Sequence, residues 1–134
     1  MRVSRIAALF VAVCIGLVGP VLAQVGHPVK GSWVGYWGPS EKDQRRLVLN
    51  MDWQSNQIVA VINPGPKSAK VRRADIDYAN WTLVLEADLP NKSGTPTRWV
   101  ATGKLENLGS WNNRRYSGTY QYGGETGKFV VALH

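Results

Sequence analysis

The sequence predicts an all-β fold, a single antiparallel meander that closes into an eight-stranded up-and-down barrel, with a β-sandwich as the alternative. Three observations lead to this fold class. After residue 23 helical periodicity is absent, and short runs of alternating apolar and polar residues take its place. Clusters of Gly, Pro, Asn and Asp interrupt these runs every 8–14 residues or so, about the spacing of sandwiches and barrels. The connections are short, and an even number of meandering strands can close and remove its edges.

The first four predicted strands end at clear turn signals. They cover residues 31–37, 45–53, 58–62 and 69–76. Gly38-Pro39 ends the first, and Asn63-Pro64-Gly65-Pro66 stops the third because proline cannot donate to a strand ladder. The fourth strand has two candidate phases, since Val71 and Ile76 have opposite parity and cannot both face the core of a regular strand.

The last four predicted strands cover residues 81–89, 98–105, 115–122 and 128–133. The fifth alternates most cleanly, with five apolar residues on one face: Trp81, Leu83, Leu85, Ala87 and Leu89. Loops 90–96 and 106–113 flank the sixth strand, and Gly123-Gly124-Glu125 forms the turn into the eighth. An eight-stranded barrel is just wide enough to be filled by side chains or to hold one small ligand.

The first 23 residues have the features of a cleavable signal peptide. Arg2 and Arg5 give a positive start, an apolar stretch follows over residues 6–18, and small residues precede a cleavage point after Ala23. The stretch is shorter than the roughly 20 residues that a membrane-spanning helix needs. Its length therefore favours a cleaved signal peptide over the alternative, an N-terminal membrane anchor. We expect a secreted or periplasmic protein with no membrane span after cleavage.

Cleavage leaves a short arm, residues 24–30, and one domain over residues 31–134. The mature part carries 14 basic and nine acidic residues, and the only cysteine, Cys14, leaves with the signal peptide. An exported domain without cysteine must be stabilised by core packing alone. The positive charge favours acidic ligands and also maintains solubility. No specific nucleic-acid binding is expected.

Two segments resemble the small barrels of the lipocalin and avidin group, the calycin type. Gly31-Ser32-Trp33 resembles their Gly-x-Trp opening, and residues 116–124 resemble an avidin-like penultimate strand and turn. The resemblance implies a closed barrel in which Trp33 plugs one end. The polar residues with which avidins hold biotin have no counterparts, so biotin binding is not implied. Segments 63–65 and 103–109 are similar to secreted bacterial domains of unassigned function.

The sequence offers no recognisable catalytic constellation. A serine nucleophile would need a histidine base, and only His27 and His134 are present, both at chain ends. Glu86 and Asp88 share the polar face of their strand and are expected to be solvated. The segment 123–127 opens a strand rather than a helix, so it is no phosphate loop. We therefore expect a non-enzymatic protein without a cofactor.

His27 and His134 are also the candidate metal ligands. In a closed antiparallel barrel the first strand pairs with the last, which brings the start of one beside the end of the other. Two imidazoles and the terminal carboxylate could then bind Zn²⁺ or Cu²⁺. The alternative is that both termini are frayed and exposed.

Two pairs of adjacent arginines, Arg45-Arg46 and Arg72-Arg73, suggest a ligand site at one mouth of the barrel. Adjacent strand residues point to opposite faces, and Arg45 shares the inward parity of Leu47. We expect an aromatic-walled site for an anionic ligand, formed by Arg45, Arg73, Trp37, Trp53 and Tyr120. In the alternative, the arginines lie over the rim and pair with acidic residues.

The predicted function is an exported binding module that holds a small, anionic or aromatic ligand at the barrel mouth. The alternative is an envelope protein–protein adaptor or inhibitor that acts through loops such as 106–113. In that alternative Trp111, Arg114 and Arg115 are the candidate partner contacts, because aromatic and arginine side chains dominate interface hot spots. The expected partner is accordingly a small molecule or an exported protein.

Overall fold

The structure, a computed structural model, describes residues 27–110 and 112–134. The predicted signal peptide, its cleavage point and Trp111 lie outside these residues. Eight strands make up the fold: β1 (Gly31–Ser40), β2 (Asp43–Gln54), β3 (Gln57–Ile62), β4 (Ala69–Asp77), β5 (Thr82–Pro90), β6 (Pro96–Glu106), β7 (Arg115–Tyr122) and β8 (Glu125–Leu133). Within the described ranges there is no helix long and apolar enough to cross a membrane.

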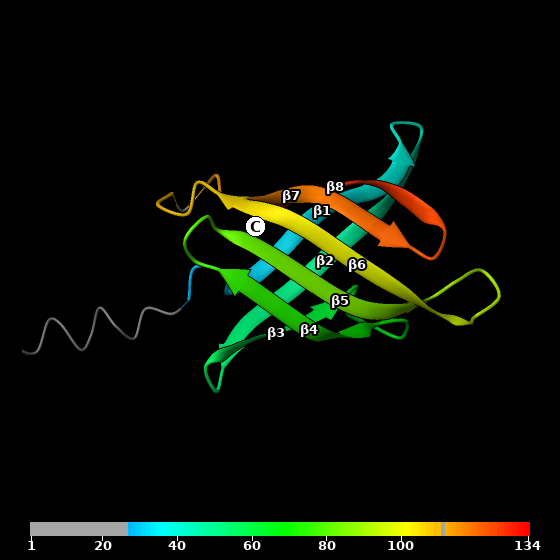
Figure 1. Ribbon diagram of the computed structural model, residues 1–134, viewed down its shortest axis with the longest axis horizontal. Coiled ribbons are helices and arrows are strands. Elements are labelled where there is room, and N and C mark those ends of the chain that lie inside the picture. The colour runs from blue at the N-terminus through cyan, green and yellow to red at the C-terminus, as the bar shows by residue number, and fades with distance from the viewer. Residues whose placement is uncertain (1–26, 111) are drawn as a thin grey trace, which may run out of the picture.

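The strands form a closed antiparallel up-and-down barrel, which confirms the predicted fold class (Figure 1). Each strand pairs with the next, and β1 closes the barrel by pairing with β8 from Trp33↔Leu133 to Gly38↔Lys128. The His134 backbone N–H extends this pairing by donating to the Ser32 carbonyl at 2.8 Å. A sandwich is therefore excluded.

A β-bulge in β4 resolves the two candidate phases of that strand. Val71 pairs with Ala87, but the register shifts before Arg73, which pairs with Glu86. The extra residue lets Val71 and Ile76 both pack against the core, although their parities differ. As a consequence, Arg73 points to the outside of the barrel, where its Nε lies 2.6 Å from Asp75.

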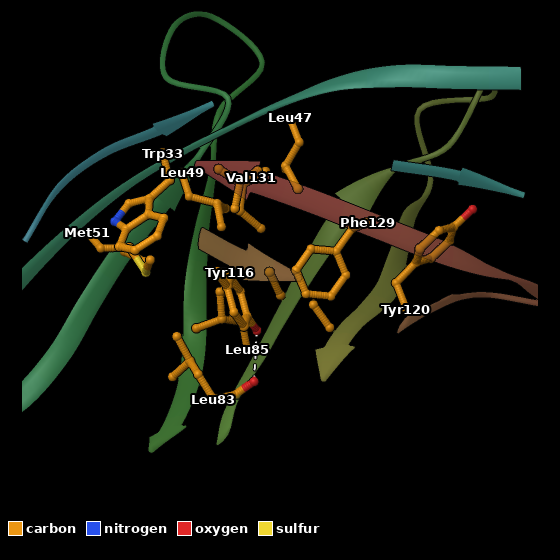
Figure 2. Close-up of a cluster of buried hydrophobic side chains, with 14 of the residues drawn as sticks. Trp33, Leu47, Leu49, Met51, Leu83, Leu85, Tyr116, Tyr120, Phe129 and Val131 are labelled. Atoms are coloured by element: carbon orange, nitrogen blue, oxygen red, sulfur yellow. Dashed lines mark hydrogen bonds between the residues drawn. The ribbon is translucent and has the colours of Figure 1, made fainter. Parts of the chain in front are cut away.

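Bulky side chains fill the middle of the barrel (Figure 2). Tyr116 is fully buried, and its hydroxyl donates to the Leu83 carbonyl at 2.8 Å. Burial raises the pKa of Tyr116 far above its ordinary value, so the phenol stays protonated. The Phe129 ring lies edge-on to Tyr116 and occupies the space over Gly103, where an added Cβ would lie 2.7 Å from it. Room for a ligand is therefore confined to the two ends.

One end, here called the plugged end, is formed by the arm 27–30, the β2–β3 and β4–β5 turns and the β6–β7 loop. Trp33 is fully buried there, and its indole N–H donates to the carbonyl of the equally buried Val29 at 2.7 Å. Arg114 holds the arm down, because its guanidinium donates to the Pro28 carbonyl and to the Ser110 carbonyl, both at 2.9 Å. This end is closed by the chain itself.

Candidate functional site

The opposite end, here called the mouth, is formed by the β1–β2 turn, loops 63–68 and 91–95, and the β7–β8 turn (Figure 1). It contains a hollow of about 450 Å³, which is within the size range of small-molecule sites. The lining combines apolar and polar side chains: Trp37, Arg45, Asn63, Lys67, Leu89, Pro90, Asn91, Lys92, Tyr122 and Glu125.

Arg45 is the central cation of the mouth. It is on the inward face of β2, and its guanidinium carbon lies 3.8 Å from the centre of the Trp37 ring and 5.8 Å from that of Tyr122. These distances are those of cation–π contacts. The guanidinium is ion-paired with Glu125, and 35% of the Arg45 side chain remains exposed. Its Nε is buried and has no hydrogen-bond partner among the described residues.

Among the residues that the structure describes, Glu125 is the one carboxylate that lines the hollow. Its Oε2 accepts hydrogen bonds from Arg45 and from the Tyr120 hydroxyl, the latter at 2.7 Å. Partial burial alone would raise the pKa of Glu125, but the bonds from Tyr120 and Arg45 and the charges of Arg45 and Lys92 lower it below its ordinary value. Burial and the neighbouring carboxylate raise the pKa of Tyr120. At neutral pH the group is thus a carboxylate bound by a neutral phenol and a guanidinium.

Trp37 separates the hollow from the filled interior. Its ring meets Tyr120 at 4.8 Å, Tyr122 at 5.2 Å and Trp99 at 6.0 Å between centroids, each nearly perpendicular. These are favourable edge-to-face contacts. Trp99 is fully buried, yet its Nε1 donor has no hydrogen-bond partner in the described part of the chain. Two unsatisfied donors, on Arg45 and Trp99, therefore belong to side chains that contact Trp37.

The structure brings together three of the five residues predicted to form the ligand site: Arg45, Trp37 and Tyr120. Trp53 does not join them, because β2 runs from the mouth to the plugged end and Trp53 is near its far end, stacked on His27 at 4.5 Å. Arg73 is outside the barrel because of the bulge in β4. The structure thus places three of the five predicted residues together, and ligand binding by them stays a prediction.

The two histidines predicted to bind a metal have different neighbours. The His27 imidazole stacks on Trp53 and lies 2.7 Å from the Tyr78 hydroxyl. His134 is near the start of β1, as the closed barrel predicts. No group of three or more His, Cys, Asp or Glu gathers among residues 27–110 and 112–134. Metal binding by these histidines stays a prediction.

The predicted partner contacts have different surroundings. Arg114 is partly buried and bonded to the arm and to the loop backbone, so its guanidinium has a structural role. Arg115 is exposed on the outer face of β7, beside a shallow hollow of about 390 Å³ that Tyr36 and Val130 also line. Trp111 is outside the described residues.

Sequence reasoning missed Glu125, Tyr122, the two lysines and the two asparagines of the mouth. Glu125 could have been found from the alternation of β8, since it shares the inward parity of Phe129. It was missed because the predicted strand began at Lys128, whereas β8 begins at Glu125. The loop residues Lys67 and Lys92 carry no such periodic signal, since loops 63–68 and 91–95 have no alternating pattern.

Comparison with protein-family models, with curated proteins and with solved structures found no match for this chain. The closed eight-stranded antiparallel barrel is compatible with a calycin-like fold. The function must accordingly be argued from the mouth itself.

Proposed function

We propose that this protein is an exported, non-enzymatic binding module of the lipocalin and avidin-like type, which holds a small anionic ligand at the mouth. A signal peptide cleaved after Ala23 would deliver it to the periplasm or the exterior. Barrels of this size commonly bind one small ligand at an open end.

One observation carries the proposal: the Arg45 guanidinium faces a hollow, lies over Trp37, and has a buried Nε donor without a partner among the described residues. A buried donor without a partner costs free energy that a ligand acceptor can recover. The aromatic floor adds apolar contact area for the rest of the ligand. The unpartnered Arg45 donor and the aromatic floor both lie at the mouth, so the proposal rests on this one part of the barrel.

The arrangement favours binding over catalysis. The mouth carboxylate, Glu125, is engaged by Arg45 and Tyr120, and its lowered pKa makes it a poor proton acceptor at neutral pH. His27 is at the plugged end, far along the barrel from the mouth. The charged groups of the mouth thus suit a site that holds an anion.

Native mass spectrometry of the protein purified from the exported fraction tests this proposal. We expect a retained small molecule in the wild type and its loss in Arg45→Gln. Arg46→Gln is the matched control, because Arg46 is adjacent in sequence but exposed on the outer face. Retention of the same mass by Arg45→Gln would contradict binding at the mouth.

A second candidate function, the envelope adaptor or inhibitor, is favoured by an exposed apolar area on the outer wall. Tyr36 is 53% exposed and pairs across the β1–β8 ladder with Val130, which is 37% exposed. Arg115 borders the same hollow. If this face binds a partner, Tyr36→Ser should abolish association with that partner, whereas Arg45→Gln should not.

A further inference from the structure

The side chains around the mouth hollow offer more hydrogen-bond donors than acceptors. Arg45, Lys67 and Lys92 contribute three positive charges, and Glu125 contributes one negative charge. Neither lysine forms a salt bridge within the described residues. The charged side chains that line the hollow therefore carry a net charge of two positive units, and the two lysines among them are exposed to solvent.

Asn63 adds a donor because its amide orientation is fixed. The Asn63 Oδ1 accepts the Val48 backbone N–H at 3.0 Å, while the Asn63 backbone N–H donates to the Val48 carbonyl at 2.8 Å. Asn63 also has a positive φ of 48°, a conformation that asparagine tolerates better than most residues. With the oxygen engaged, the NH₂ group is what Asn63 can offer to a ligand.

Asn91 has the same arrangement on the other loop. Its Oδ1 accepts the backbone N–H groups of Ser93 at 2.9 Å and Thr95 at 3.0 Å. A flipped amide would face these two N–H groups with another donor, so the orientation is determined by the backbone. Two NH₂ groups, from loops 63–68 and 91–95, thus join the three cations around the hollow.

The carboxylate of the mouth is partly engaged, through its Oε2. Both bonds to Glu125 Oε2, from Arg45 and Tyr120, are formed within the protein, and the Tyr122 hydroxyl donates to the Pro90 carbonyl at 2.9 Å. A ligand must therefore bring several acceptor oxygens and few donors. One carboxylate would satisfy two of the donors and cancel half of the net charge.

We propose that the group bound at the mouth is a compact dianionic oxyanion, a phosphate monoester, carried on a flat apolar body that contacts Trp37, Tyr122 and Leu89. Its three terminal oxygens match the excess of donors, and its two negative charges match the net charge of the hollow. This inference rests on the proposed function, since it names the ligand class of the same site.

Fluorescence titration with phenyl phosphate and phenyl sulfate at constant ionic strength tests the ligand class, because the two probes share size and shape and differ by one charge. The change in tryptophan fluorescence emission reports binding at the mouth. We expect phenyl phosphate to bind about tenfold more tightly than phenyl sulfate. Inorganic phosphate should bind more weakly than phenyl phosphate; equal affinity would overturn the part of the proposal that assigns an apolar body.

Exposed lysines supply variants that should fold normally. Lys67→Gln and Lys92→Gln should each weaken phenyl phosphate about three- to fivefold, and should weaken phenyl sulfate less. Lys104→Gln and Lys128→Gln, exposed on the outer wall, are the controls and should change neither affinity.

The outcomes separate this inference from the proposed function. Equal affinities for the two probes, both lost in Arg45→Gln, would overturn the phosphate assignment and leave the mouth as a binding site. A retained natural ligand without phosphorus would do the same. Absence of binding by either probe, together with no retained mass in native spectrometry, would overturn both proposals.

Discussion

A buried tryptophan lies at each end of the barrel core, in a different chemical setting. At the plugged end, Trp33 donates its indole N–H to Val29 and is covered by the arm. At the mouth, Trp37 lies beneath Arg45 and next to Trp99, whose indole N–H has no partner among the described residues. Figure 2 shows the cluster between them, with Trp33 and Tyr120 at opposite sides.

This difference separates stability from recognition. The plugged end satisfies its buried donor with backbone and needs no further molecule. The mouth leaves the Arg45 Nε donor unsatisfied and gathers positive charge. Both cost stability in the free protein, and under the proposed function an anion would recover part of that cost. The comparison predicts that substitutions at the plugged end affect unfolding, whereas equivalent substitutions at the mouth affect binding.

The largest expected effect is that of Trp33→Ala. Removing a fully buried indole leaves a cavity and exposes the Val29 carbonyl to an empty space, which should lower the free energy of unfolding by about 3–5 kcal/mol. Urea unfolding followed by circular dichroism measures this change. Trp33→Phe, which preserves part of the volume, should give an intermediate loss. A loss below about 1 kcal/mol would show that the arm does not seal this end.

A smaller effect distinguishes two tyrosines of β7. Tyr116→Phe removes a buried hydrogen bond to the Leu83 carbonyl and should lower the free energy of unfolding by about 1–2 kcal/mol. Tyr120→Phe should cost less than about 1 kcal/mol, because water at the mouth can replace the phenol beside Glu125. Urea midpoints of the two variants compare them directly, and a reversed order would contradict the proposed division between core and mouth.

The plugged end should respond to pH first. Burial lowers the pKa of His27 below its ordinary value of about 6.5, so the folded protein binds this proton less tightly than the unfolded chain. The stability that His27 contributes is present above the unfolded pKa and is lost as pH falls through the folded pKa. We expect the urea midpoint to decrease from pH 7.5 to 5 less in His27→Gln than in the wild type. His134→Gln, at an exposed position, is the control and should retain the wild-type decrease.

The mouth should respond only in more acidic solution, with the smallest effect. The pKa of Glu125 is below its ordinary value, so its contribution is present above the unfolded pKa, about 4.3, and is lost as pH falls through the folded pKa. The urea midpoint of the wild type should decrease below about pH 4.5, where Glu125 begins to be protonated. Glu125→Gln should remove part of this decrease. An unchanged acid profile in Glu125→Gln would mean that the pair with Arg45 contributes nothing measurable.

Periodicity predicted the fold because inward and outward residues alternate in nearly every strand. The same alternation placed Arg45, Trp37 and Tyr120 inside the barrel. It failed for Arg73, because a bulge inserts one residue into β4 and reverses the phase, and such an insertion leaves no local signal beyond the conflict between Val71 and Ile76.

The position of a residue along the barrel axis was harder to predict than its face. Trp53 has the inward parity of Arg45 in β2, but eight residues separate them, and at about 3.3 Å per residue they are at opposite ends. Lys67 and Asn91 were missed because loop conformation depends on specific backbone bonds, such as those that Asn91 accepts from Ser93 and Thr95.

The tryptophan indole N–H signals in a ¹H–¹⁵N correlation spectrum test the division between the two ends most directly. Each signal is assigned with the variants Trp33→Phe, Trp37→Phe and Trp99→Phe, and phenyl phosphate is then titrated into the wild type. We predict saturable shifts of the Trp37 and Trp99 signals and an unchanged Trp33 signal. A shift of Trp33 alone, or saturable binding that moves none of the three, would contradict the assignment of recognition to the mouth.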